Sequence, residues 1–172
     1  MKKFQFLLLD AGPIIKLFEL DIWDAFIERC DVTISKTVAV EAKWASQEFE
    51  DIRIELERYE EQKLIKIIDL ELSVVKAFYD KFNLTYKDIH DGEKETLAFL
   101  CKSSENWKVC SADHVVFRVL GLLNKADQGI SLEEILVEIG LSQSKLELKY
   151  TKRFREKWTR KGQVDFTQGQ GL

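Results

Sequence analysis

The chain has 172 residues, of which 45% are hydrophobic and 33% charged, and its formal net charge is −4. This composition indicates one folded domain and excludes a disordered chain. No apolar run reaches membrane-spanning length, and the run near the N-terminus meets Asp10 where a signal peptide would have a small-residue cleavage site. The three cysteines lack CxxC spacing, and only two histidines are present, so no zinc site is expected. We therefore expect a cytoplasmic protein with free thiols and no membrane association.

Alternating strand-like and helix-like patterns run along the whole chain. In chain order we expect a strand over 4–9, helices from Gly12-Pro13 and over 22–29, a strand over 32–34, a helix starting at 35–37, a strand over 64–68, helices over 71–82 and 91–104, a strand over 107–111, and helices over 113–123 and 131–139. This alternation predicts an α/β fold of three layers, with a central, mostly parallel sheet between helices.

Two segments have a regular apolar stripe typical of amphipathic helices. The first predicts one long helix from residue 35 to Tyr59, and its stripe consists of Val38, Ala42, Ala45, Phe49, Ile52, Leu56 and Tyr59. The second lies near the C-terminus, where Leu146, Tyr150, Phe154 and Trp158 recur every four residues. We expect a helical C-terminal extension over 126–166, packed on a domain formed by residues 1–125, and a disordered tail over 167–172.

Positive charge is concentrated in this extension. Between Lys145 and Lys161 eight basic residues stand against two acidic ones, a net charge of +6 that leaves −10 for the rest of the chain. Such asymmetry is expected where one segment meets nucleic acid or an acidic partner. A solvated helix face is the ordinary alternative. The candidate nucleic-acid-binding residues are Lys149, Lys152, Arg153, Arg155 and Lys157.

Acidic residues follow the predicted strands at several junctions with helices. Asp10 ends the run at 4–9, Asp113 follows the strand at 107–111, and Glu41 lies near the start of the predicted long helix. Open α/β sheets bind ligands beyond the carboxyl ends of their strands. Carboxylates that converge without basic partners favour a hard divalent cation. The ordinary alternatives are helix capping for Asp10 and Asp113 and a flanking surface acid for Glu41.

The third acid of such a site has two competing positions. Glu93 and Glu95 point to nearly opposite sides of a helix, so at most one of them can contact a metal directly. Asp91 nearly shares the side of Glu95, although it is also suited to capping the helix, and Glu93 suits the positive helix end. Ser111, two residues before Asp113, could hold a carboxylate or a phosphate through its hydroxyl group.

Four segments, taken in order, resemble the motifs of PIN domains, and most of all prokaryotic members with a Gly-Glu-x-Glu segment. They are Leu-Leu-Leu-Asp10-Ala-Gly, Ile34-Ser-Lys-Thr-Val-Ala-Val-Glu41-Ala, Gly92-Glu-Lys-Glu95-Thr-Leu-Ala and Cys110-Ser111-Ala-Asp113. The resemblance covers roughly residues 4–125, and each motif is short. There are two departures from the family pattern. The third acid is a Glu with Glu93 as a competing register, and the last motif reads Ser-Ala-Asp-His where an additional polar or acidic residue is often present.

The resemblance implies a pocket of acids that holds Mg²⁺ or Mn²⁺ and hydrolyses RNA, often in the toxin of a toxin–antitoxin pair. Carried over by motif, the metal-binding and catalytic residues are Asp10, Glu41, Glu95 and Asp113. An antitoxin protein is then an expected partner, and a homodimer remains open.

Two other functions compete with this interpretation. Haloacid-dehalogenase-like phosphatases also begin with a strand-terminal Asp, but they need a second Asp two residues later, where this chain has Gly12. A PIN-like module without catalytic activity, which binds nucleic acid or a partner protein, would explain the basic extension equally well. Loss of the acids should abolish the function of an enzyme but not that of such a binding module.

Overall fold

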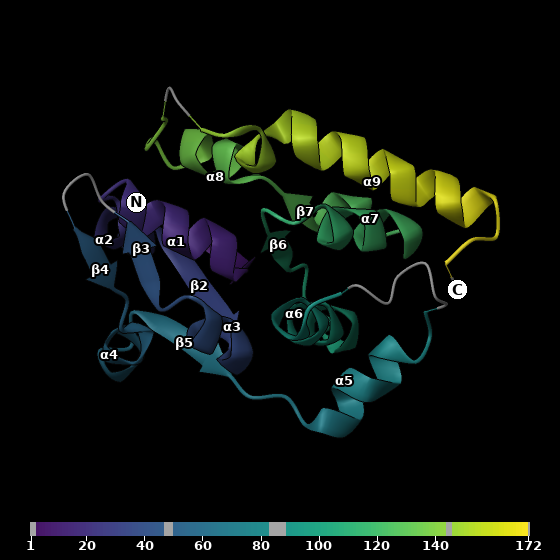
Figure 1. Cartoon of the computed structure of the whole chain (residues 1–172), viewed down its shortest axis with the longest axis horizontal. Helices are drawn as coiled ribbons and strands as arrows, with labels where there is room; N and C mark the ends of the chain where they lie inside the picture. The colour runs from purple at the N-terminus through teal and green to yellow at the C-terminus, as the bar shows by residue number, and fades with distance from the viewer. Residues whose placement is uncertain (1–2, 47–49, 83–88, 144–145, 172) are drawn as a thin grey trace.

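A five-stranded parallel sheet forms the centre of the protein (Figure 1). The computed structural model describes residues 3–46, 50–82, 89–143 and 146–171. The strands of the sheet, in the order β5-β2-β1-β6-β7, are β5 (Ile65–Ile68), β2 (Cys30–Ser35), β1 (Phe4–Leu9), β6 (Lys108–Cys110) and β7 (Gly129–Ile130). Every neighbouring pair is parallel. The predicted α/β class with a parallel sheet between helices is thereby confirmed.

Helices cover both faces of this sheet. They are α1 (Ala11–Glu19), α2 (Trp23–Arg29), α3 (Lys36–Glu41), α4 (Leu56–Glu61), α5 (Leu72–Tyr79), α6 (Asp91–Lys102), α7 (His114–Leu122), α8 (Leu132–Glu138) and α9 (Lys152–Thr167), with short 3₁₀ turns at Ala126–Gln128 and Leu148–Tyr150. None of the helices in the described ranges is long and apolar enough to cross a membrane.

The alternation of side chains along β1 produces two separate cores. Leu7 and Leu9 are fully buried in one core, together with residues of α1, α2 and α8. Leu8 lies in the other core, which α6 and α7 cover. Because successive residues of a strand point to opposite faces, a strand buried on both faces has to be apolar throughout its buried part. The Leu7-Leu8-Leu9 run therefore fixes β1 at the centre of the sheet.

The predicted long helix from residue 35 to Tyr59 is wrong. Helix α3 ends at Glu41, and an antiparallel hairpin of β3 (Trp44–Ser46) and β4 (Asp51–Arg53) separates it from α4. The apolar stripe does not distinguish a long helix from a hairpin, because the positions of its members fit both. Ala45 is buried between the exposed residues Trp44 and Ser46, which is the period of a strand, and it pairs with Ile52. Phe49 lies outside the described residues.

The C-terminal extension is built into the same sheet and core. It contributes β7 to the sheet, and α9 packs along α7, beside which it lies in Figure 1. A Cβ atom placed on Gly162 would lie 1.8 Å from the carbonyl oxygen of Arg118. Arg118 in turn pairs with the buried Asp165 at 2.6 Å. These contacts make α9 a structural part of the domain.

The expected basic helix differs from the observed one in its bounds. Helix α9 begins at Lys152, where the hydroxyl of Thr151 accepts a hydrogen bond from the Phe154 N–H, and it continues to Thr167. Of the tail expected to be disordered, Thr167 therefore belongs to α9, residues 168–171 follow it, and the last residue lies outside the described part of the chain.

Candidate metal centre

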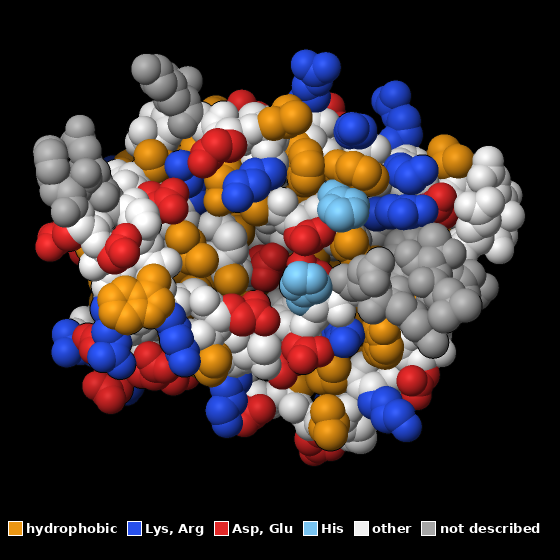
Figure 2. Space-filling model, viewed as in Figure 1, with side chains coloured by type: hydrophobic (Ala, Val, Ile, Leu, Met, Phe, Trp, Pro, Cys, Tyr) orange, Lys and Arg blue, Asp and Glu red, His pale blue; other side chains and the backbone are white. Residues whose placement is uncertain are grey.

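The acids predicted at strand ends meet at the carboxyl edge of β1 and β6. Asp10 follows β1 directly, and its backbone N–H donates to the carbonyl oxygen of Cys110 at 3.0 Å, which ties the two strand ends together. Asp113 lies three residues beyond the end of β6. Figure 2 shows acidic side chains, together with the two histidines of the chain, near the middle of one face of the molecule.

Asp10 is a buried carboxylate with two hydrogen-bond donors. Its Oδ1 accepts from the Ala11 N–H at 2.9 Å, so it caps α1, and its Oδ2 accepts from the Ser111 hydroxyl at 2.6 Å. Burial raises the pKa of Asp10, the two hydrogen bonds lower it, and the nearby charge of Asp113 raises it again. The capping alternative is thus realised, but it uses only one of the two carboxylate oxygens.

Ser111 connects the first and last acids of the cluster. Its side chain is fully buried, and its hydroxyl donates to Asp10 while accepting from the backbone N–H of Asp113 at 2.9 Å. Asp113 caps α7, because its Oδ1 accepts from the Val115 N–H at 2.8 Å, and the same oxygen lies 3.2 Å from His114 Nδ1. This chain of hydrogen bonds fixes the two aspartates relative to each other.

The structure turns Glu93, and not Glu95, toward these aspartates. Glu93 is buried, and burial together with the negative charges of Asp113 and then Asp10 raises its pKa to about 8. Its Oε2 accepts from the backbone N–H of His90 at 3.0 Å, as the third helical residue of a capping box does. This capping bond orients the side chain of Glu93 toward the start of α6 and the strand ends.

Glu95 has a different partner. Its carboxylate accepts from the Thr37 hydroxyl at 2.7 Å and from the Thr37 N–H at 3.2 Å, which satisfies a free donor at the start of α3. Glu95, which the motif resemblance indicated as the third acid, therefore binds the start of α3 instead. Glu93 lies beside the aspartates. Asp91 is exposed and pairs with Lys94 at 2.9 Å.

Glu41 completes the cluster from the end of α3. A Cβ atom on Gly92 would lie only 2.7 Å from its Oε2, so the absence of a side chain at position 92 lets this carboxylate approach α6. Glu41 is among the exposed residues, but partial desolvation of its carboxylate and then the charge of Asp10 raise its pKa, and the Gly92 N–H lowers it by hydrogen bonding. Glu41 belongs to the group although the long helix expected around it does not exist.

The donor chemistry of this cluster fits a hard divalent cation. Asp10, Glu41, Glu93 and Asp113 come from four separate segments, and in the described part of the chain none of the four forms an ion pair with Lys or Arg. However, no three of the His, Cys, Asp and Glu side chains in the described ranges already converge as metal ligands. The carboxylates repel one another, and their side chains would have to move for them to share one ion.

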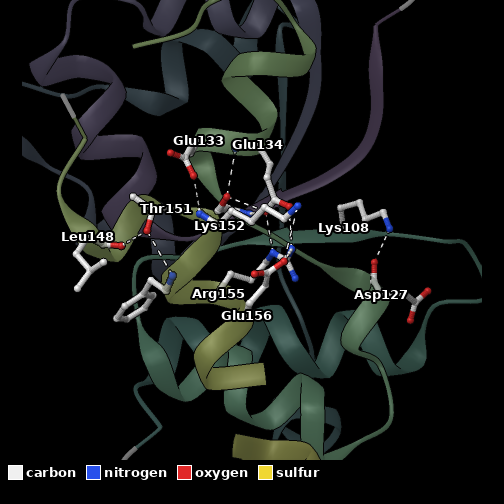
Figure 3. A network of polar contacts seen from close by, with 11 residues as sticks. Lys108, Asp127, Glu133, Glu134, Leu148, Thr151, Lys152, Arg155 and Glu156 are labelled. Atoms are coloured by element: carbon white, nitrogen blue, oxygen red, sulfur yellow. Dashed lines mark hydrogen bonds and ion pairs between the residues drawn. The ribbon is translucent and has the colours of Figure 1, made fainter. Parts of the chain in front are cut away.

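The basic residues predicted to bind nucleic acid do not form one free surface. Arg155 makes two hydrogen bonds to Glu134, at 2.7 and 2.8 Å, and its side chain is only 14% exposed (Figure 3). Lys152 Nζ lies 3.7 Å from Glu156, while Lys149 and Lys157 lie over the rings of neighbouring aromatic residues. Arg155 therefore anchors α9 to α8, which leaves the exposed Lys149, Lys152, Arg153 and Lys157 as the group that can meet a ligand.

Fold and site together describe a parallel α/β protein with a cluster of acids at the carboxyl edge of its sheet. Comparisons with protein-family models, with curated proteins and with solved structures find no match. Function is therefore inferred from the residues of the chain and from the motif resemblance.

Proposed function

We propose that this protein is a metal-dependent endoribonuclease that hydrolyses RNA phosphodiester bonds with Mg²⁺ or Mn²⁺. The observation that carries the proposal is the meeting of Asp10, Glu41, Glu93 and Asp113 at one sheet edge, without a lysine or arginine partner in the described ranges. A fold that crowds four carboxylates loses stability unless a cation offsets their repulsion. Such crowding is typical of sites whose function requires it.

Each acid has a distinct part in this proposal. Asp10, Glu93 and Asp113 would hold the ion, and Glu41, at the end of α3, would complete its ligands. A bound divalent ion supplies an acidified water and offsets the charge that develops on the phosphate. Ser111 keeps Asp10 and Asp113 in fixed relative positions through its two hydrogen bonds. Neither histidine is required as a general base in this scheme.

The choice of RNA as substrate, and of a toxin–antitoxin context, rests on the resemblance of the four motifs to PIN domains. In that context an antitoxin protein would be the natural partner. The structure adds one compatible feature, which is the set of exposed lysines and Arg153 on or next to α9.

The test is cleavage of a labelled single-stranded RNA by the purified chain with Mg²⁺, with Mn²⁺ and with a chelator. We expect cleavage only with metal, and loss of cleavage in Asp10→Asn and Asp113→Asn. Glu95→Gln is the matched control, because this carboxylate faces Thr37 and should leave cleavage in place. Full cleavage by both aspartate variants would falsify the proposal.

A module that binds nucleic acid or a partner protein without catalysis is the second candidate. It is favoured by the finding that no three candidate ligands in the described ranges converge as they stand. For such a module the acid cluster would matter for stability alone. RNA binding that persists in Asp10→Asn, together with no cleavage by the wild type under any metal condition, would select this candidate.

A further inference from the structure

Two pockets lie at the amino ends of the strands, at the edge of the sheet opposite the acids. The first, of about 360 Å³, is lined among others by Phe6, Trp107, Lys63 and Lys66. The second, of about 440 Å³, is lined among others by Lys3, Arg29 and Lys108. Both pockets also share Gln5 in their lining, so they adjoin each other. Neither pocket has a role in the proposed hydrolysis.

An exposed aromatic side chain stands at the first pocket. Phe6 is 40% exposed although it belongs to the central strand β1, and its ring meets that of Trp107 edge-on at 5.4 Å. Trp107 is held from another direction by Phe99, whose ring centroid lies 5.2 Å away. Phe6 thus packs on Trp107, which packs in turn on Phe99, while part of Phe6 is open to solvent.

The backbone of Phe6 is strained. Its φ angle is 58°, in the left-handed region, at the point where the pairing of β1 with β2 shifts register. For a residue with a side chain this conformation costs roughly 1–2 kcal/mol. Bulges re-aim side chains next to binding sites, and strain of this kind is typical of functional positions. The bulge leaves the ring of Phe6 partly exposed, although neighbouring Leu7, Leu8 and Leu9 are buried.

The same edge carries an excess of positive charge. Neither Lys63 nor Lys66 pairs with an acidic side chain in the described part of the chain, and Asp31, the acid of the first pocket, lies 3.6 Å from Lys3 Nζ. In the second pocket Arg29 Nη1 donates to the Ile139 carbonyl at 2.8 Å.

Lys108 Nζ similarly donates to the Asp127 carbonyl, as Figure 3 shows. Carbonyl partners orient these cations without neutralising them. Among the described residues, Glu138 is the one acid that lines the second pocket. In a chain of net charge −4, this edge is therefore a local cationic surface.

We propose that these two pockets form a binding surface for single-stranded nucleic acid, separate from the acid cluster. A base would stack on Phe6, and Lys63 and Lys66 would contact the flanking phosphates. The second pocket would continue the phosphate path. Single-strand binders combine a positive groove with aromatic rings on which bases stack. A duplex offers no free base face to Phe6, so the exposed ring favours a single strand.

The proposal is tested by fluorescence anisotropy with a fluorescein-labelled, twelve-nucleotide oligothymidylate and the full chain in EDTA. Without metal, binding is measured independently of any cleavage, so this test can fail while the nuclease proposal stands. Phe6→Gly removes the ring and also suits the φ angle of 58°, so the fold should be kept, which circular dichroism checks. We expect at least about fivefold weaker binding. Phe166→Ala is the matched control, because Phe166 is a 55% exposed aromatic residue on α9.

The double substitution Lys63→Gln with Lys66→Gln tests the charges. It should reduce the slope of log affinity against log salt by about 1.4, because each phosphate contact with a single strand contributes roughly 0.7. Lys152→Gln with Lys157→Gln tests the α9 lysines as a competing surface, and Lys76→Gln with Lys81→Gln, two exposed lysines in and after α5, is the matched double control. No binding by the wild type, or full affinity in Phe6→Gly, would overturn the proposal. So would a loss confined to the α9 variant, or competition by dTMP as strong as by the oligonucleotide.

Discussion

Replacement of Glu93 by Gln should stabilise the protein at pH 8 and leave its stability at pH 5 nearly unchanged. Glu93 keeps its proton in the folded state up to a pKa of about 8, whereas its ordinary value is 4.5. The folded state therefore binds more protons between these values. The stability that protonated Glu93 contributes is fully present below about pH 4.5 and is lost as the pH rises to about 8.

The size of the stability gain follows from the shift in the pKa of Glu93. Each pKa unit corresponds to 1.36 kcal/mol, so the full shift gives an upper limit of roughly 5 kcal/mol. Asp113 and Asp10 can relax when Glu93 ionises, so we expect a gain of about 2–4 kcal/mol for Glu93→Gln at pH 8. A neutral amide can still accept the His90 N–H bond that Glu93 accepts at 3.0 Å, so little is lost at pH 5.

The assay is urea unfolding in EDTA at pH 5 and pH 8, evaluated by linear extrapolation. Glu95→Gln is the matched control on the same helix. Its carboxylate accepts two hydrogen bonds from Thr37, so its loss should destabilise the protein by about 1–2 kcal/mol at both pH values. If Glu93→Gln is no more stable than wild type at pH 8, or if the two variants behave alike, the claim that α6 turns Glu93 toward the aspartates is refuted.

Three further substitutions probe the contacts around the site and along α9. Gly162→Ala should destabilise the fold by about 3 kcal/mol or more in urea, because its Cβ would lie 1.8 Å from a backbone oxygen of α7; a loss below about 1 kcal/mol would contradict this packing. Gly92→Ala should displace the flexible carboxylate of Glu41 and weaken the Mn²⁺-induced rise in melting temperature; an unchanged Mn²⁺ response would argue against Glu41 as a ligand. Ser111→Ala should reduce Mn²⁺ affinity in calorimetry about 10- to 100-fold, because Asp10 and Asp113 lose their shared partner; unchanged affinity would limit Ser111 to a structural role.

The positions of Asp10 and Asp113 could be predicted because strand ends are visible in the sequence. The run Leu7-Leu8-Leu9 can be buried on both faces only in a central strand, and parallel strands carry their ends to one edge. Ser111 could also be recognised as a holder of a carboxylate, because it precedes Asp113 by two residues.

The third acid was harder to predict, because helical periodicity separates Glu93 from Glu95 but does not orient α6. What orients the helix is the packing of α6 on α3, where Glu95 meets Thr37 and Gly92 makes room for Glu41. Those contacts join residues more than fifty positions apart in the chain. The capping box that turns Glu93 inward begins with His90, which does not have the usual hydroxyl or carboxylate of such a cap.

The hairpin of β3 and β4 and the short strand β7 were missed for another reason. Each of these strands has two or three residues, too few to show a period. Their structure depends on pairing partners, since β7 is a strand through its pairing with β6. Local sequence therefore predicted the α/β architecture, whereas tertiary packing decided which glutamate of α6 faces the aspartates.

The most direct test of the account is a Mn²⁺ titration followed by the electron paramagnetic resonance signal of free Mn²⁺, at pH 7.5, on wild type and Asp10→Asn. Wild type should remove Mn²⁺ from solution at a saturable site, Asp10→Asn should not, and the control Glu95→Gln should bind like wild type. Absence of saturable Mn²⁺ binding by the wild type, or equal binding by Asp10→Asn, would contradict the claim that these carboxylates form a metal centre.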